Sequence, residues 1–227
     1  MFLNIEGALM SIITLTGHLG SIGNIPTLLA ESLGYRLIDR QLLIESAQML
    51  GMSDKELEQF DERTKGLGGP LSNFLKKFIE KSSLAGIDPS GLEATFASSY
   101  ADTSRSFQSD DLMYIETMTE VMKGYALEGN VVIVGRGGQA IFKNSKDASH
   151  FRIVCDPEER IKRFAESQNI DLENARKRVV DSDTQREIWH KKYFSIDYRS
   201  PYLYKMVINS EFSSDEKIVQ TITNFIN

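Results

Sequence analysis

A short glycine-rich segment, residues 16–24, most constrains what this chain can fold into. The segment reads T-G-H-L-G-S-I-G-N, follows an apolar run at residues 11–15 and precedes a helical pattern at residues 25–33. A strand, a glycine-rich turn and a helix in this order let backbone N–H groups bind phosphate at the helix N-terminus. The residues of the predicted phosphate-binding turn are Gly17, His18, Gly20, Ser21, Ile22, Gly23 and Asn24.

The turn departs from a complete Walker A motif, G-x-x-x-x-G-K-[ST], at three positions. With Gly17 as the first glycine, Ile22 stands at the second glycine, Gly23 at the lysine and Asn24 at the Ser/Thr position. A β-branched residue such as Ile22 tolerates positive φ poorly. The turn keeps its backbone donors but lacks the ammonium group that neutralises β- and γ-phosphate charge. The alternative is an ordinary β–α turn that binds nothing.

Composition excludes some partners and leaves others open. The chain has 227 residues, enough for one domain with insertions, and a net charge of −6. This charge argues against general affinity for nucleic acids or anionic membranes, so phosphate recognition needs a local basic site. The sequence contains no signal-peptide pattern, no 18-residue apolar run and a single cysteine, Cys155, so we expect a cytoplasmic protein. A homodimer is compatible with the sequence, which contains nothing that fixes an oligomeric state.

Short apolar runs alternate with helical patterns, which favours an α/β fold with a doubly wound parallel sheet. The expected strands are residues 11–15, 35–38, 131–134, 151–155 and 205–209. The expected helices are residues 25–33, 40–50, 54–60, 71–79, 111–127, 157–167, 172–189 and 215–226. We expect one domain over residues 1–227, and its expected parts are a core of residues 10–40, 128–170 and 200–227, an insertion at about 41–127 and a lid at about 171–199.

Arginines follow two of the expected strands. Arg136 follows residues 131–134 and lies between two glycines that leave space for a ligand. A guanidinium at the carboxyl end of a parallel strand can hold phosphate oxygens through two hydrogen bonds. A salt bridge to a neighbouring carboxylate is the alternative. Asp39 and Arg40 follow residues 35–38, and Asp39 could hold a substrate hydroxyl or a metal-bound water, or cap the next helix.

The expected helix at residues 172–189 carries a basic face. Arg178, Ser182 and Arg186 are spaced by four residues and therefore share one side of the helix. Asp183 precedes Arg186 by three residues and could orient its guanidinium. A solvated charged helix is the alternative. Considered with the turn and with Arg136 after residues 131–134, this basic face favours a mobile basic lid that closes on phosphates.

Metal and nucleophile motifs are missing from the sequence. The three histidines and the single cysteine have no zinc-site spacing, and no G-x-S-x-G motif occurs. We therefore assign no metal-ligating residue.

Six segments occur in a fixed order along the chain. They are G-S-I-G-N at 20–24, L-I-D-R-Q-L-L at 37–43, V-I-V-G-R-G at 132–137, C-D-P-E-E-R at 155–160 with Arg163, D-x-x-R at 183–186 followed by Tyr193 and Phe194, and Y-K-M-V-I-N at 204–209. In order and spacing they resemble the cytidylate kinase-like family, relatives of the nucleoside monophosphate kinases. The likeness extends from Ile12 to Ile222.

The resemblance implies a three-layer P-loop kinase-like fold with five parallel strands, a helical insertion that closes over the acceptor and an arginine-bearing lid. It also implies ATP as the phosphoryl donor, with Mg²⁺. By position, the resemblance assigns Arg178 and Arg186 to transfer and Arg136 to the acceptor. From the residues themselves we add Asp39 for transfer, and Arg40 and Asp183 for the acceptor. The chain departs from the family pattern at the lysine, and it has Val134 and Gly137 where a D-G-R-D sequence would place carboxylates.

Three hypotheses follow from the sequence. The first is a phosphotransferase similar to nucleoside monophosphate kinases, which moves the γ-phosphate of a nucleoside triphosphate to a small acceptor such as a nucleotide. The second is a pseudo-kinase that keeps the fold as a nucleotide-binding or protein-interaction module, which the missing lysine favours. The third is a purely structural domain, which no phosphate ligand would stabilise.

Overall fold

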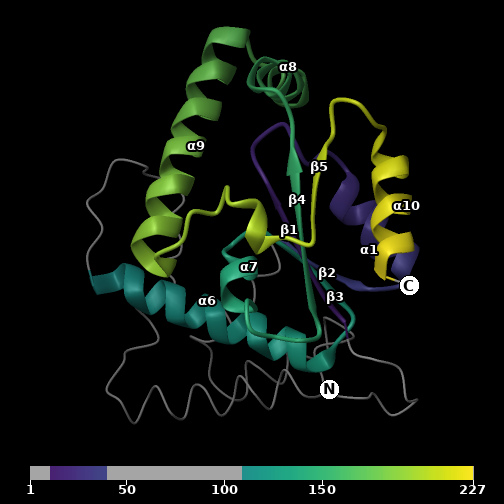
Figure 1. Ribbon diagram of the computed structural model, residues 1–227. Coiled ribbons are helices and arrows are strands. Elements are labelled where there is room, and N and C mark those ends of the chain that lie inside the picture. Colours follow the sequence, from purple (N-terminus) through teal and green to yellow (C-terminus); the bar gives the residue numbers. More distant parts are fainter. Residues whose placement is uncertain (1–10, 40–108, 227) are drawn as a thin grey trace, which may run out of the picture. The chain divides into compact units, whose positions relative to one another are not determined.

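The computed structural model describes residues 11–39 and 109–226 of the chain (Figure 1). The chain divides into two compact units, residues 1–37 with 130–227 and residues 38–129. The expected helices at 40–50, 54–60 and 71–79 lie outside the described residues. The single domain with an insertion at about 41–127 and a lid at about 171–199 stays a prediction.

Five parallel strands form one sheet in the order β2-β3-β1-β4-β5 (Figure 1). The strands are β1 (Ile12–Gly17), β2 (Arg36–Ile38), β3 (Val131–Val134), β4 (Ala148–Val154) and β5 (Met206–Asn209). Leu15 on β1 is in register with Val134 on β3, and Thr16 is in register with Arg152 on β4. The ends of β1, β3 and β4 therefore meet at one edge of the sheet, where open α/β sheets bind their ligands.

Helices alternate with these strands along the chain. They are α1 (Ile25–Leu33), α6 (Ser109–Glu128), α7 (Gly138–Ile141), α8 (Pro157–Gln168), α9 (Leu172–Phe194) and α10 (Asp215–Ile226), with a 3₁₀ turn at Pro201–Leu203. Every strand and helix expected within the described residues is confirmed to within a few residues at its ends. The sequence analysis missed α7 and the 3₁₀ turn, which are too short to show a hydrophobic period.

The two faces of β1 have different roles. Ile13 and Leu15 pack with Leu29 of α1 and Ile222 of α10 in the main hydrophobic core, and Figure 1 shows these two helices side by side. Because side chains alternate along a strand, the threonines of β1 point to the opposite face, where Thr14 lies against α7 at Gly138. The central strand is buried on both faces, as expected for a parallel sheet with helices on both sides.

No helix in the described part of the chain is both long enough and apolar enough to cross a bilayer.

Candidate phosphate-binding site

The turn after β1 is shaped by the buried side chain of Ser21. Its Oγ accepts a hydrogen bond from the His18 amide (2.8 Å) and lies 2.9 Å from the His18 carbonyl oxygen, to which it donates. Ser210, which follows β5, donates from its Oγ to the Ser21 carbonyl (2.8 Å). The Ser21 hydroxyl therefore serves the turn's own conformation.

Glycine is required at two positions of the turn. Gly20 has φ +77°, and a Cβ there would lie 2.2 Å from the Arg160 carbonyl oxygen of α8. Gly23 has φ +49°, and a Cβ there would lie 2.5 Å from Oδ2 of Asp215. Ile22 does not adopt positive φ, and its side chain packs against the main core. The expected strain at Ile22 is therefore absent, and its side chain belongs to the core.

The amides of the turn fall into two groups. Those of Leu19, Gly20, Ile22 and Gly23 donate no hydrogen bond to any described residue. The Asn24 amide donates to Oδ2 of Asp215 at 2.8 Å. The first four are donors before the N-terminus of α1, where the helix dipole also favours an anion.

Asp215 brings a negative charge to the position where the Walker motif has its lysine. The carboxylate belongs to the first residue of α10 and lies against both Gly23 and the Asn24 amide. A lysine at position 23 would thus need its Cβ where this carboxylate lies. A phosphate that reached the Asn24 amide would compete with the carboxylate for the same N–H group.

An ion pair connects the turn to α8 and α9. Arg160 is 5% exposed and binds Asp183 through two hydrogen bonds, Nη1–Oδ1 at 3.1 Å and Nη2–Oδ2 at 2.7 Å. Arg160 Nη1 also donates to the Leu19 carbonyl oxygen at 3.4 Å. Asp183 thus orients Arg160, whereas its spacing in the sequence suggested Arg186. The charge of Asp183 raises the pKa of Arg186.

The structure brings together two of the arginines predicted from the sequence. Arg136 has φ +51° between two glycines that also have positive φ, and this turn lies against α9, where a Cβ on Gly137 would meet Phe194 at 2.6 Å. Arg186 is half-buried, and its Nε is buried without a hydrogen-bond partner among the described residues. Burial lowers the pKa of Arg186, and the charge of Arg136 lowers it further. The charges of these two arginines therefore act on one another.

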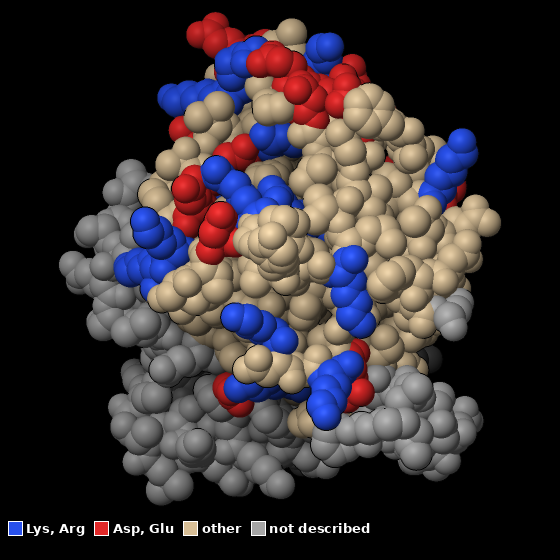
Figure 2. All heavy atoms as spheres, viewed as in Figure 1, with Lys and Arg blue, Asp and Glu red and all other residues tan. Residues whose placement is uncertain are grey.

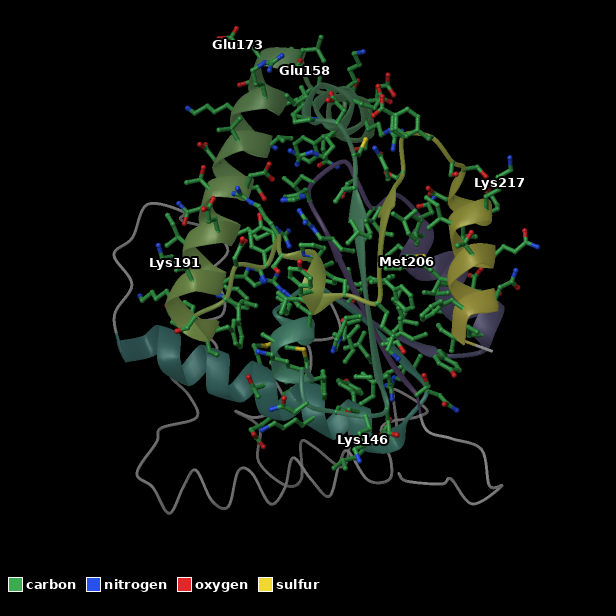
Figure 3. The ribbon with its side chains drawn as sticks, viewed as in Figure 1. Lys146, Glu158, Glu173, Lys191, Met206 and Lys217 are labelled. Atoms are coloured by element: carbon green, nitrogen blue, oxygen red, sulfur yellow. The ribbon has the colours of Figure 1, made fainter. Side chains whose placement is uncertain are left out.

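Other basic residues of α9 lie away from this group. Arg178 is exposed and has no polar contact with a described residue. Figure 3 shows Lys191 pointing away from the sheet, and Arg176 binds Glu158 where α8 and α9 begin. Figure 2 shows basic side chains in the middle of the viewed face, between α9 and the strands, with acidic side chains beside them. A role of Arg178 at the transferred phosphate stays a prediction.

Arg152 on β4 is a site residue that the sequence analysis missed. Its Nη1 donates to the Arg199 carbonyl oxygen (2.7 Å), and its guanidinium lies 5.7 Å from the centre of the Tyr198 ring. Its Nε is buried and has no hydrogen-bond partner among the described residues. The signal that could have found it is a charged residue inside an otherwise apolar strand, F-R-I-V.

A buried polar network lies beneath the arginines. Thr16 Oγ1 donates to Gln139 Oε1 (3.1 Å), and Gln139 Nε2 donates to His190 Nε2 (3.0 Å). His190 is 2% exposed and donates from Nδ1 to the Arg186 carbonyl oxygen (2.7 Å), which fixes its neutral tautomer. It also stacks on Tyr198, with ring centres 4.5 Å apart. The network anchors the carboxyl-terminal half of α9 to β1 and α7.

Burial and several charges near the turn affect the pKa of His18. Its Nε2 lies within hydrogen-bonding distance (2.9 Å) of the Tyr198 hydroxyl. Burial lowers the pKa of His18 to about 4; Asp183 raises this pKa, whereas the charges of three arginines lower it. These are Arg160, Arg186 and Arg152. Of the three, Arg160 is neutralised by Asp183.

The remaining predicted site residues are placed as follows. Asp39 directly follows β2, is half-buried and belongs to the unit of residues 38–129. Arg40 lies outside the described residues. Within residues 11–39 and 109–226, no group of three or more His, Cys, Asp or Glu residues could hold a metal ion.

Replacing His190 with Gln should reduce the pH dependence of stability. Burial lowers the pKa of His190 from 6.5 to about 4. Between these values the unfolded chain binds the proton and the folded chain does not, so the free energy of unfolding falls as pH decreases. For His190 the loss should be about 2 kcal/mol between pH 7 and pH 5. Urea titrations of both proteins at the two pH values measure it, and an equal loss in H190Q would contradict the buried neutral imidazole.

Comparison with known proteins places the chain in a family. A family model described as the cytidylate kinase-like family matches residues 12–212. The cytidylate kinase of Staphylothermus marinus is 34% identical over 101 residues, which cover 44% of this chain and 56% of that protein. That of Thermoplasma acidophilum is 28% identical over 98 residues, which cover 43% and 52%. The chain thus matches about half the length of these curated relatives.

A solved structure shows the same fold. The uncharacterized protein from Eubacterium ventriosum has a TM-score of 0.61 and 20% identity, and the match covers 96% of this chain and 98% of that one. The α/β fold class with a five-stranded parallel sheet that the sequence predicts is confirmed. Because the family match covers most of its length, the chain belongs to the cytidylate kinase-like family.

Proposed function

We propose that the protein is a phosphotransferase that moves the γ-phosphoryl group of a nucleoside triphosphate to a small acceptor such as a nucleoside monophosphate. The observation that carries the proposal is the turn with four amides available as donors, together with Arg186, whose charge acts on His18 of that turn and on whose pKa the charge of Arg136 acts. Amides and guanidinium groups are the donors that bind phosphate oxygens in phosphoryl-transfer sites.

Each group has one task in the proposed reaction. The amides of Leu19, Gly20, Ile22 and Gly23 hold the donor phosphates. The bond from the γ-phosphorus to the bridging oxygen breaks as a bond to the acceptor oxygen forms, and the nucleoside diphosphate leaves. Arg186 neutralises charge on the transferred group and Arg136 holds the acceptor, so catalysis consists of positioning and charge stabilisation.

In the proposed reaction, ATP binds together with Mg²⁺. Mg²⁺ is usually held by one or two carboxylates and by the substrate's own phosphates, which suits a site with few acidic residues. Its contribution would be to neutralise phosphate charge. The sequence analysis gives roles to four further residues, and these stay part of the proposal: Arg178, Arg40, Asp183 and Asp39. A cytoplasmic location and a homodimer also remain part of the proposal.

One observation favours the alternative, a catalytically impaired pseudo-kinase. The carboxylate of Asp215 binds the Asn24 amide and lies where an active P-loop has its lysine. Negative charge at this point opposes the binding of a triphosphate. In that case the protein binds a nucleotide or a protein partner without transfer.

Replacing Arg186 with Gln should lower kcat/KM for the best nucleoside monophosphate by about 100- to 1000-fold, because the transferred group loses a charged donor. ATP turnover against a panel of nucleoside monophosphates, with Mg²⁺, measures this effect. R176Q is the matched control, since Arg176 is an exposed α9 arginine that binds Glu158. The proposal is wrong if the wild type transfers phosphate to no acceptor, or if R186Q is as active as the wild type.

Replacing Asp215 with Asn should increase the affinity for ATP by about five- to tenfold. The amide oxygen of Asn can still accept from the Asn24 amide, but the negative charge beside Gly23 is removed. Isothermal titration calorimetry on both proteins measures the change. E211Q removes a nearby exposed carboxylate and should leave the affinity unchanged. Weaker binding by D215N would show that the carboxylate assists the donor.

A further inference from the structure

Arg152 has surroundings that the fold does not explain. The residue lies on β4 in register with Thr16, the last threonine of β1 before the turn. Its side chain is half-buried, and its Nε is a buried donor with no partner among the described residues. The Nε of Arg186, on α9, is likewise a buried donor with no partner among the described residues.

Geometry links Arg152 to the turn, and charge links Arg186 to it. The guanidinium of Arg152 lies 5.7 Å from the centre of the Tyr198 ring, and the Tyr198 hydroxyl lies 2.9 Å from Nε2 of His18. The charges of both Arg152 and Arg186 lower the pKa of His18, which belongs to the turn. Both also oppose the effect of burial on the pKa of Tyr204, which burial raises to about 12. Since Arg152 comes from the sheet and Arg186 from the helix above it, they approach one region from two sides.

Neither of these arginines forms an ion pair within the described residues, although others nearby do. Arg160 binds Asp183, and Arg199, whose guanidinium also lies 5.7 Å from the Tyr198 ring centre, binds Glu187. A partly buried charge without a counter-ion destabilises a folded protein. An anion that binds to both arginines would compensate both charges.

The lysine position of the turn cannot supply positive charge. Gly23 has positive φ, and the place where its side chain would begin is beside the Asp215 carboxylate. Charge that neutralises a bound phosphate must therefore come from another element. Arg152 lies near the carboxyl end of β4, the strand next to β1, whereas Asp215 begins α10.

We propose that Arg152 and Arg186 together bind one phosphoryl group of the ligand held by the turn, with Arg152 supplying the positive charge that position 23 lacks. The inference rests on the proposed function, because the ligand is the phosphate-bearing donor of that reaction. It adds a phosphate-binding residue from β4 to the turn and the lid helix.

A structural role for Arg152 makes the opposite prediction for stability. If the residue served only to hold Arg199 and Tyr198, its loss would destabilise the protein and leave anion binding unchanged. If it binds phosphate, Arg152→Gln removes an uncompensated charge, so stability without an anion stays equal or rises, while stabilisation by an anion is lost.

The test compares the melting temperature of the full chain in sodium pyrophosphate and in sodium chloride of equal ionic strength, which keeps screening constant. We expect the wild type to melt about 5 °C higher in pyrophosphate. R152Q should lose most of this rise without melting lower in chloride, R152K should keep part of it, and R199Q, the matched control, should keep all of it. Calorimetric titration with pyrophosphate repeats the comparison as affinities.

The outcomes separate this inference from the proposed function. A full pyrophosphate effect in R152Q overturns the inference, and it does so whether or not R152Q melts lower in chloride. If R152Q does not fold, a full effect in R152K with unchanged affinity overturns it as well. Loss of the effect in R152Q, in a protein that transfers phosphate to no acceptor, supports the inference and removes the proposed reaction. A wild type that pyrophosphate does not stabilise contradicts both.

Discussion

The buried ion pair between Arg160 and Asp183 holds the site together. It joins α8 to α9, and the same guanidinium reaches the Leu19 carbonyl oxygen of the turn. The backbone of α8 also lies so close to Gly20 that no side chain fits between them. Because the turn, α8 and α9 share these contacts, loss of the pair would weaken the attachment of both the turn and α9 to α8.

The contrast between the arginines of this region explains how the site could bind an anion. The charge of Arg160 is compensated by Asp183, and this pair holds the turn, α8 and α9 together. Arg152 and Arg186 have buried Nε groups without partners among the described residues, and the charge of Arg136, in the turn after β3, acts on Arg186. Arginines from β4 and α9 therefore bring positive charge to the turn, as their effect on the pKa of His18 shows, whereas Asp215 of α10 brings negative charge to Asn24. A phosphate on the turn would be attracted by the arginines and repelled by Asp215.

Much of the fold could be predicted from the sequence, because hydrophobic periods and turn residues are local signals. The runs at 131–134 and 215–226 became β3 and α10 as expected. The contacts between elements could not be predicted in this way. Asp215 lies 191 positions from Asn24, and the network from Thr16 to His190 depends on how α9 packs over the sheet. Arg152 was missed because a single charge in a strand gives no periodic signal.

The central claim is that guanidinium groups on β4 and α9 take the place of the missing lysine. The most direct measurement is the arginine Nε–H region of a ¹H–¹⁵N NMR spectrum during titration with pyrophosphate, with the two signals assigned from R152K and R186K. The account predicts that both signals move downfield together and become protected from exchange with solvent, because each Nε gains an acceptor. Signals that keep their positions and exchange rates while pyrophosphate binds would contradict it.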